Sequence, residues 1–291
     1  MPRKPITAGM FYEDVFQALD KQITECFTHR RGPGDLPVKK RNKETIGIIA
    51  PHAGYAFSGP CQAWAYKEIA ESRFPDLFII LGTNHQGLGK SATLLDDFET
   101  PFGIVKTDIE FAKKLIKNSE FQLIENPELH ANEHSIEVQL PFLQFVNKDY
   151  LNDIKIVPII VSAGSDYKVL ANAIHKTALA LNKKIMFIAS SDLTHYGISY
   201  GYVPFHDNIK QKLYDLDKGA IKFIEKRDSW AFLDYVKETK ATICGAHAIA
   251  AAIELARLMK AKEANLLHYY TSGDMTNDYA NAVGYASVVF R

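Results

Sequence analysis

The sequence predicts a single α/β domain in which helices cover both faces of a mostly parallel or mixed central sheet. Apolar runs rich in β-branched residues alternate with segments of helical periodicity along nearly the whole chain. The runs are apolar without interruption, which is typical of strands buried on both faces. The chain has 291 residues, of which 47% are hydrophobic, so it can build one large core.

The predicted elements follow one another in regular alternation. Strands are expected at residues 46–49, 77–81, 154–161, 185–190, 266–271 and 282–290, and the last two are expected to pair antiparallel. Helical patterns cover residues 60–72, 108–117, 133–146, 166–182, 207–225 and 245–260. Such alternation predicts crossover connections and helices on both faces of the sheet.

The charge balance argues against nucleic-acid and membrane partners, and the cysteines indicate the cellular compartment. Lys plus Arg and Asp plus Glu number 34 each, so no net charge attracts the chain to nucleic acid or an anionic membrane. The basic segment 29–43 lacks interleaved aromatic residues and predicts a surface loop, not a nucleic-acid arm. The cysteines are scattered, which favours a reducing, cytoplasmic location. The most apolar segment, residues 241–258, contains His247 and Glu254 and predicts no membrane span.

Three histidines follow predicted strands at the point where each strand ends. His52 lies between Pro51 and Gly54, His85 follows the next strand along the chain, and His195 follows the strand at 185–190. Carboxyl ends of parallel strands share one edge of a sheet, so these side chains are expected to meet in a crevice there. Imidazole is a common ligand for zinc, copper and iron, although each ring could instead bond a nearby carbonyl.

Two further side chains are candidates for the same crevice. Cys244 lies just before the helix predicted at 245–260, where the helix dipole favours a thiolate that could bind metal or react. A small buried hydrophobic residue is the alternative interpretation of Cys244. Asp192 precedes His195 by three residues, and a carboxylate beside an imidazole fixes its tautomer and raises its basicity. A cap of a local turn is the alternative for Asp192.

A second acid–base pair is predicted at the start of the helix expected at 133–146. With Asn132 as cap, His134 and Glu137 share one face of this helix. The pair could act as acid and base or set a carboxylate against a metal-bound imidazole. It could also be a solvated pair at a helix start.

Six segments in order along the chain together resemble the Memo family. They are residues 8–12, 51–59, 132–137, 190–197, 244–245 and 270–274. The resemblance runs from about residue 7 to the C-terminus and implies one Memo-like domain over residues 1–291. It also implies a fold similar to that of the class III extradiol ring-cleaving dioxygenases, whose non-haem iron lies at one edge of the sheet.

The resemblance implies which residues hold a metal. By the family pattern His52, His85 and Cys244 match the metal-binding trio, while Asp192 and His195 match residues that line the same pocket. The dioxygenases use two histidines and a glutamate. The softer Cys244 thiolate shifts the preference toward copper, zinc or a differently tuned iron. The expected cofactor is one iron or copper ion, with zinc as a further option.

The leading functional hypothesis is a metal-dependent redox enzyme, dioxygenase-like or an oxidase, acting on a small molecule or a peptide. His195 is expected to be the acid or base, with Asp192 orienting it. His134 and Glu137 would supply hydrogen bonds around the ligands, and Tyr55 would form a pocket wall.

The alternative hypothesis is a non-catalytic peptide- or protein-binding module that uses the same crevice. Animal Memo proteins are associated with receptor signalling and phosphopeptide recognition. For archaeal and bacterial relatives, the resemblance implies AMMECR-type and radical-SAM partners in a shared modification pathway.

Overall fold

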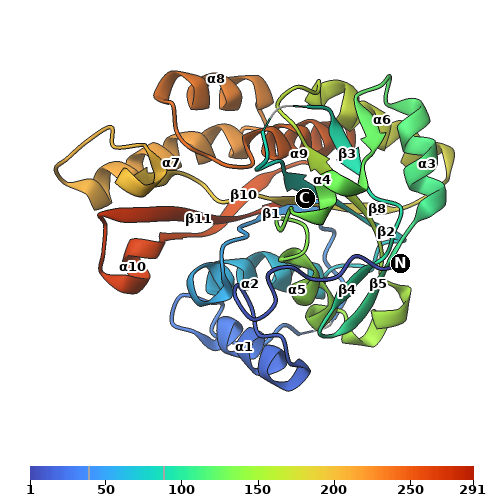
Figure 1. The fold of residues 1–291 in the computed structure, drawn as a ribbon, viewed down its shortest axis with the longest axis horizontal. Coiled ribbons are helices and arrows are strands. Elements are labelled where there is room, and N and C mark those ends of the chain that lie inside the picture. Colours follow the sequence, from blue (N-terminus) through green and yellow to red (C-terminus); the bar gives the residue numbers. More distant parts are fainter. Residues whose placement is uncertain (39, 88) are drawn as a thin grey trace.

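Among the residues that the structure describes, a mixed sheet of 11 strands forms the centre of the protein (Figure 1). The computed structural model describes residues 1–38, 40–87 and 89–291. The main path through the sheet runs in the order β10-β11-β1-β8-β2-β7-β3-β6. Its central strands pair in parallel and are β1 (Gly47–Ala50), β8 (Ile185–Ser190), β2 (Leu77–Thr83) and β7 (Lys155–Val161). The predicted α/β class with a mixed sheet is therefore confirmed.

The two C-terminal strands add an antiparallel part to the sheet beside β1. β11 (Asn281–Phe290) pairs antiparallel with both β1 and β10 (Ala264–Thr271), as the sequence predicts. The short helix α10 (Ser272–Thr276) connects β10 to β11. The remaining strands are β3 (Ser91–Thr93), β4 (Phe98–Thr100), β5 (Gly103–Thr107), β6 (Leu123–Glu125) and β9 (His195–Gly197), of which β9 pairs with β11.

Alternate residues of the central strands enter two separate cores. Ile49 and Leu81 pack on one face of the sheet, and Ile48 and Ile80 pack on the other. The first face is covered by α3 (Ile109–Asn118), α6 (Tyr167–Ala180), α7 (Ile209–Glu225), α8 (Ser229–Thr239) and α9 (Ala246–Leu258) (Figure 1). The second is covered by α1 (Phe16–Thr28), α2 (Tyr55–Glu71) and α5 (Gln139–Val146). Because both faces are buried, the central strands are apolar at nearly every position.

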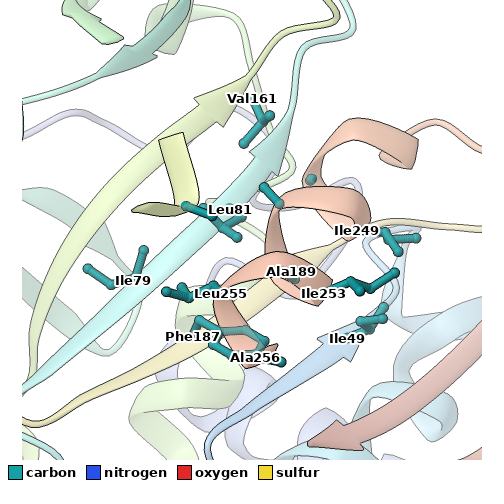
Figure 2. Close-up of a cluster of buried hydrophobic side chains, with 14 of the residues drawn as sticks. Ile49, Ile79, Leu81, Val161, Phe187, Ala189, Ile249, Ile253, Leu255 and Ala256 are labelled. Carbon is teal, nitrogen blue, oxygen red and sulfur yellow. The ribbon is translucent and has the colours of Figure 1, made fainter. Parts of the chain in front are cut away.

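Helix α9 lies directly over the centre of the sheet. Figure 2 shows Ile249 and Ile253 of this helix in the same cluster as Ile49 and Ala189 of the strands beneath. All four side chains are buried. The packing holds the start of α9 over the carboxyl end of the central strands.

Local capping explains where several helices begin. The side chains of Asp108, Asp166 and Asp228 each accept a hydrogen bond from a backbone N–H in the first turn of α3, α6 and α8. The predictions for α3, α6, α7 and α9 are confirmed to within a few residues. Helices α1 and α8 are absent from the predicted set, and α2 begins at Tyr55, ahead of the predicted start at residue 60.

The helix predicted at 133–146 is shorter in the structure. Of this range only Gln139–Val146 is helical. Residues 132–138 are turns and irregular backbone, and Asn132 ends the short helix α4 (Pro127–Ala131) instead of capping α5. The Glu133 carboxylate accepts the backbone N–H of Ser135 at 2.8 Å, which holds a turn there. Side-chain bonds of this kind compete with helical hydrogen bonds.

The described part of the basic segment 29–43 consists of turns and irregular backbone, as predicted; Lys39 lies outside the described residues. Among the helices that the structure describes, none combines the length and the apolar character needed to cross a lipid bilayer.

Candidate metal centre

The strand order brings the predicted crevice residues together. β1, β8 and β2 are adjacent and parallel, and they end just before His52, Asp192 and His85 respectively. The rings of His52 and His85 have centroids 5.2 Å apart, and Cys244 Sγ lies 3.2 Å from His52 Nε2. One ligand atom from each of His52, His85 and Cys244 lies within 4.8 Å of the others. The three residues that the sequence assigns to a metal thus form one cluster.

The hydrogen-bond network around His52 leaves its Nε2 free for a metal. Ser190 Oγ donates its proton to the Ser135 carbonyl at 2.6 Å and accepts from Gln139 Nε2 at 2.9 Å. The 3.0 Å contact between His52 Nδ1 and Ser190 Oγ must therefore have Nδ1–H as the donor. Nε2 of His52 therefore faces Cys244 Sγ, and one proton is shared between these two atoms.

His85 is oriented in the same way, by a carboxylate that the sequence analysis missed. His85 Nδ1 lies 3.0 Å from both oxygens of Glu133, and Glu133 also accepts the backbone N–H of His85 at 3.0 Å. Burial opposes the charged form, but these bonds lower the pKa of Glu133 to about 2. A carboxylate that holds Nδ1–H of an imidazole is common around metal-binding histidines, because it directs Nε2 toward the metal. Burial lowers the pKa of His85, but its hydrogen bonds to Cys244 and Glu133 raise it to about 10, so metal binding at Nε2 would release a proton.

Cys244 has the character of a thiolate. Burial raises its pKa, but the neighbouring His52 and His85 outweigh burial and lower it to about 6. Gly245, which follows, donates its N–H to Ser191 Oγ at 2.9 Å. A Cβ at this glycine would lie 2.5 Å from the Ser191 Cβ, so only glycine allows the approach. Cys244 thereby offers a soft, negatively charged ligand atom.

His195 lies beside the trio with its own Nδ1 held by backbone carbonyls. Nδ1 is 3.0 Å from the Leu193 oxygen and 3.1 Å from the Thr242 oxygen, so it carries the proton and Nε2 is free. The ligand atoms of Asp192, His195 and Cys244 lie within 4.8 Å of one another. His195 therefore lies where the sequence predicts it, but two carbonyls orient its ring.

Asp192 binds the backbone of the His52 loop and not the His195 ring. Its Oδ1 accepts the backbone N–H groups of His52 at 2.8 Å and Ala53 at 3.3 Å. No hydrogen bond to His195 is present among the described residues. Burial raises the pKa of this carboxyl group. Asp192 thus secures the loop that carries a metal ligand, and the expectation that it orients His195 through a hydrogen bond is not met.

His134 and Glu137 face different surroundings, so the predicted pair does not form. The His134 ring stacks on His85 at 4.8 Å with an interplanar angle of 9°, and its Nδ1 lies 3.7 Å from Glu133 Oε1. Glu137 instead binds the N-terminal segment, where its oxygens meet Arg3 Nη1 at 2.7 Å and the backbone N–H of Ile6 at 2.9 Å. The helix expected to align the two side chains begins only after them.

Tyr55 also lies apart from the crevice. It is 1% exposed, its hydroxyl donates to the Val138 carbonyl at 2.7 Å, and it packs edge-on against Phe142. The structure therefore places Tyr55 in the core beneath α2 and not among the residues that line the cavity.

A cavity of about 460 Å³ opens beside the cluster. Its lining includes His52, His85, His134, Asp192 and His195. Four aromatic residues also line it: Phe11, Phe57, Tyr200 and Tyr285. Its volume is that of a small-molecule site. A ligand in the cavity would reach both the candidate metal ligands and the His195 ring.

Comparison with known proteins decides the family. The family described as Memo-like protein matches residues 3–289, nearly the whole chain. The chain belongs to the Memo-like family. The sequence resemblance is therefore confirmed over nearly the whole chain.

Curated relatives of the Memo-like family match along their full length. A MEMO1 family protein of Methanopyrus kandleri is 40% identical over all of this chain and 99% of its own. A MEMO1 family protein of Methanobrevibacter smithii is 38% identical over the whole of both chains. A solved structure, an uncharacterized protein (JW3007) from Escherichia coli K12, has a TM-score of 0.52 and 11% identity. It covers 85% of this chain and 100% of its own, and it shows the similarity of fold alone.

Proposed function

We propose that this member of the Memo-like family is a metal-dependent redox protein that holds one iron or copper ion. Nε2 of His52, Nε2 of His85 and Sγ of Cys244 would bind the ion. One observation carries the proposal: all three side chains are set up to bind a metal. Each imidazole has its Nδ1–H held by an acceptor, and the pKa of the Cys244 thiol is lowered. Second-shell hydrogen bonds of this kind orient metal ligands.

The donor set supports a transition metal. Two imidazoles and a thiolate suit copper, iron or zinc, whereas magnesium and calcium prefer oxygen ligands. Iron or copper would supply one-electron and oxygen chemistry at the cavity when bound, which zinc cannot. Three protein ligands leave further coordination positions for a ligand from the cavity.

His195 supplies the proton chemistry in this proposal. Its Nδ1–H is held by the Leu193 and Thr242 carbonyls, so Nε2 can accept a proton from a molecule in the cavity and later return it. His134 lines the cavity on the side of His85 and offers a second imidazole. Asp192 keeps the His52 loop in place through backbone bonds.

Metal analysis of anaerobically purified protein tests the ligand assignment. We expect close to one equivalent of iron or copper in the native protein and a loss of most of it in the double variant His52→Ala, Cys244→Ser. The surface variant His206→Ala, exposed in the structure, is the matched control and should retain the metal. Equal metal content in native protein and double variant would contradict the assignment, provided that circular dichroism shows both to be folded.

Measurement of oxygen uptake tests the proposed redox activity. The iron-loaded and copper-loaded proteins are each measured in a sealed oxygen electrode with ascorbate and a panel of phenols, with the zinc-loaded protein as control. We expect uptake that depends on iron or copper and falls at least tenfold in His195→Ala, in line with the contribution of one general acid–base group. No uptake by either loaded form would contradict a redox role and support a binding module.

A further inference from the structure

We propose that the cavity beside the metal centre takes an aromatic molecule that carries a cationic amine, and that Asp278 recognises the amine. The proposal rests on the proposed function, because it names the class of molecule that the same cavity takes. Three features of the described residues support it: the aromatic walls, the charges of the lining and the position of Asp278.

The cavity walls favour a flat aromatic ring. Phe57 and Tyr200 line it from different elements, α2 and the short turn Ile198–Tyr200, and are 42% and 43% exposed. Phe11 and Tyr285 add two further rings to the lining. Aromatic side chains pack against a ligand ring in stacked or edge-to-face geometry, and their faces attract cations.

Asp278 is the exposed carboxylate of the cavity lining. Asp192 and Asp278 both line the cavity, whereas no lysine or arginine does so among the residues that the structure describes. The histidines belong to the metal cluster or stand beside it, and the Glu133 carboxylate balances His85 there. The part of the cavity beside Asp278 therefore favours a cationic group over a phosphate or a carboxylate.

Asp278 is the group placed to meet that cation. It lies on the exposed loop between α10 and β11, and its Oδ1 accepts the backbone N–H of Ala280 at 2.8 Å. No cationic side chain within the described ranges pairs with it. The neighbouring cation Lys210 is committed to Asp274, at 2.8 Å. Asp278 therefore has capacity for an ammonium group that enters with the ligand.

A series of three probes with one ring and different charges tests the proposal. The probes are 2-phenylethylamine, 2-phenylethanol and 3-phenylpropionate, and their dissociation constants are measured by ligand-observed NMR on the full chain, metal-free and zinc-loaded. We expect the amine to bind the metal-free protein about fivefold or more tighter than the alcohol, and the carboxylate to bind weakest. The zinc-loaded form shows separately whether the carboxylate gains affinity through the metal.

Two variants locate the recognition. Asp278→Asn should weaken binding of the amine about fivefold and leave the alcohol unchanged, whereas the control Asp153→Asn, an exposed carboxylate away from the cavity lining, should change neither. Phe57→Leu should weaken all three probes. Three results on the metal-free protein would each overturn the proposal: an amine that binds no tighter than the carboxylate, no effect of Asp278→Asn on the amine, or no detectable binding of the amine at about 10 mM.

These results are distinguishable from a failure of the proposed function. A protein that retains no metal but still prefers the amine would overturn the metal proposal and support the recognition of an amine. A protein that retains the metal but does not discriminate between the probes would support the metal proposal and overturn the recognition of an amine.

Discussion

At the scale of single residues, the metal cluster depends on what lies behind each ligand. Ser190 holds His52, Glu133 holds His85, and two backbone carbonyls hold His195. In every case the partner is an acceptor for Nδ1–H, so Nε2 is the ring nitrogen left to meet a metal. The chemistry of the crevice therefore rests on hydrogen bonds to side chains and carbonyls that would not touch the metal.

The Glu133 carboxylate should matter for metal affinity although it is no ligand in the proposal. In Glu133→Gln the charge that stabilises the His85 Nδ1–H bond is lost, so we expect the affinity for zinc to fall about 10–100-fold. Competition with a chromophoric chelator measures it. Glu128→Gln, on the exposed surface of α4, is the control. An unchanged affinity for zinc in Glu133→Gln would show that the hydrogen bond between Glu133 and His85 does not contribute to metal binding.

His130 should make stability depend on pH. It is 2% exposed, its Nε2 lies 3.2 Å from the Ala92 carbonyl, and burial lowers its pKa to about 4. The unfolded chain takes up this proton near pH 6.5 and the folded chain only near pH 4. Stability from this group is therefore complete above pH 6.5 and falls between pH 6.5 and 4, by up to about 3 kcal/mol.

Urea unfolding at a series of pH values measures the effect of His130. His130→Gln keeps a side-chain N–H donor but cannot titrate, so its free energy of unfolding should fall less between pH 6.5 and 4 than that of the native chain. The exposed His206→Gln should retain the native slope. Parallel curves for native protein and His130→Gln would contradict the prediction.

At the scale of elements, a buried carboxylate ties the N-terminal segment to the rest of the fold. Glu137 is fully buried and accepts from Arg3, from the backbone of Ile6 and Thr7, and from the Tyr12 hydroxyl at 2.8 Å. Burial opposes its charge, but these donors lower its pKa. The segment it holds carries Phe11, which lines the cavity.

Replacing this carboxylate should loosen one wall of the cavity. Phe11 packs edge-on against His134 with ring centroids 5.0 Å apart, so its position depends on the segment that Glu137 holds. In Glu137→Gln the charge of Arg3 stays buried and unpaired, which we expect to cost about 3–5 kcal/mol in the free energy of unfolding. Hydrogen exchange at residues 6–12 should become faster.

The exposed variant Glu13→Gln provides the control for Glu137→Gln and should leave both stability and exchange unchanged. If exchange at residues 6–12 does not change in Glu137→Gln, the segment is held by other contacts.

At the scale of the whole molecule, the packing of α9 on the sheet positions Cys244. The helix begins two residues after the cysteine, and its side chains are buried against the central strands (Figure 2). The strand order β1-β8-β2 sets the histidine loops at the same edge. The cluster therefore depends on the relative position of one helix and three strands.

Weakening this packing should lower stability without removing the metal site. Ile253→Ala creates a cavity between α9 and the sheet and should cost about 2–5 kcal/mol in urea unfolding. Leu179→Ala on α6, where the side chain is 68% exposed, should cost less than about 0.5 kcal/mol. Below the unfolding transition, Ile253→Ala should still bind one equivalent of zinc. A loss of metal from the folded variant would show that the site tolerates no relaxation of α9.

By itself the sequence determined the central sheet and the residues at its edge. Continuous apolar runs and helical periodicity are local signals, and a histidine that follows such a run must lie at the end of a strand. That is enough to predict His52, His85 and His195 as neighbours. The position of Cys244 before a helix made it a candidate for the same crevice, and the resemblance to the Memo family grouped it with His52 and His85.

Only the tertiary structure decided what surrounds these residues. Glu133 meets His85 from 48 positions away, and Glu137 meets Arg3 from 134 positions away. Their hydrogen bonds override the helical pattern at 133–138 and turn the two carboxylates in different directions. Tyr55 is drawn into the core for a similar reason, because its ring packs against distant side chains. Contacts between residues so far apart in the chain leave no periodic trace in the sequence, since periodicity reports only local backbone geometry.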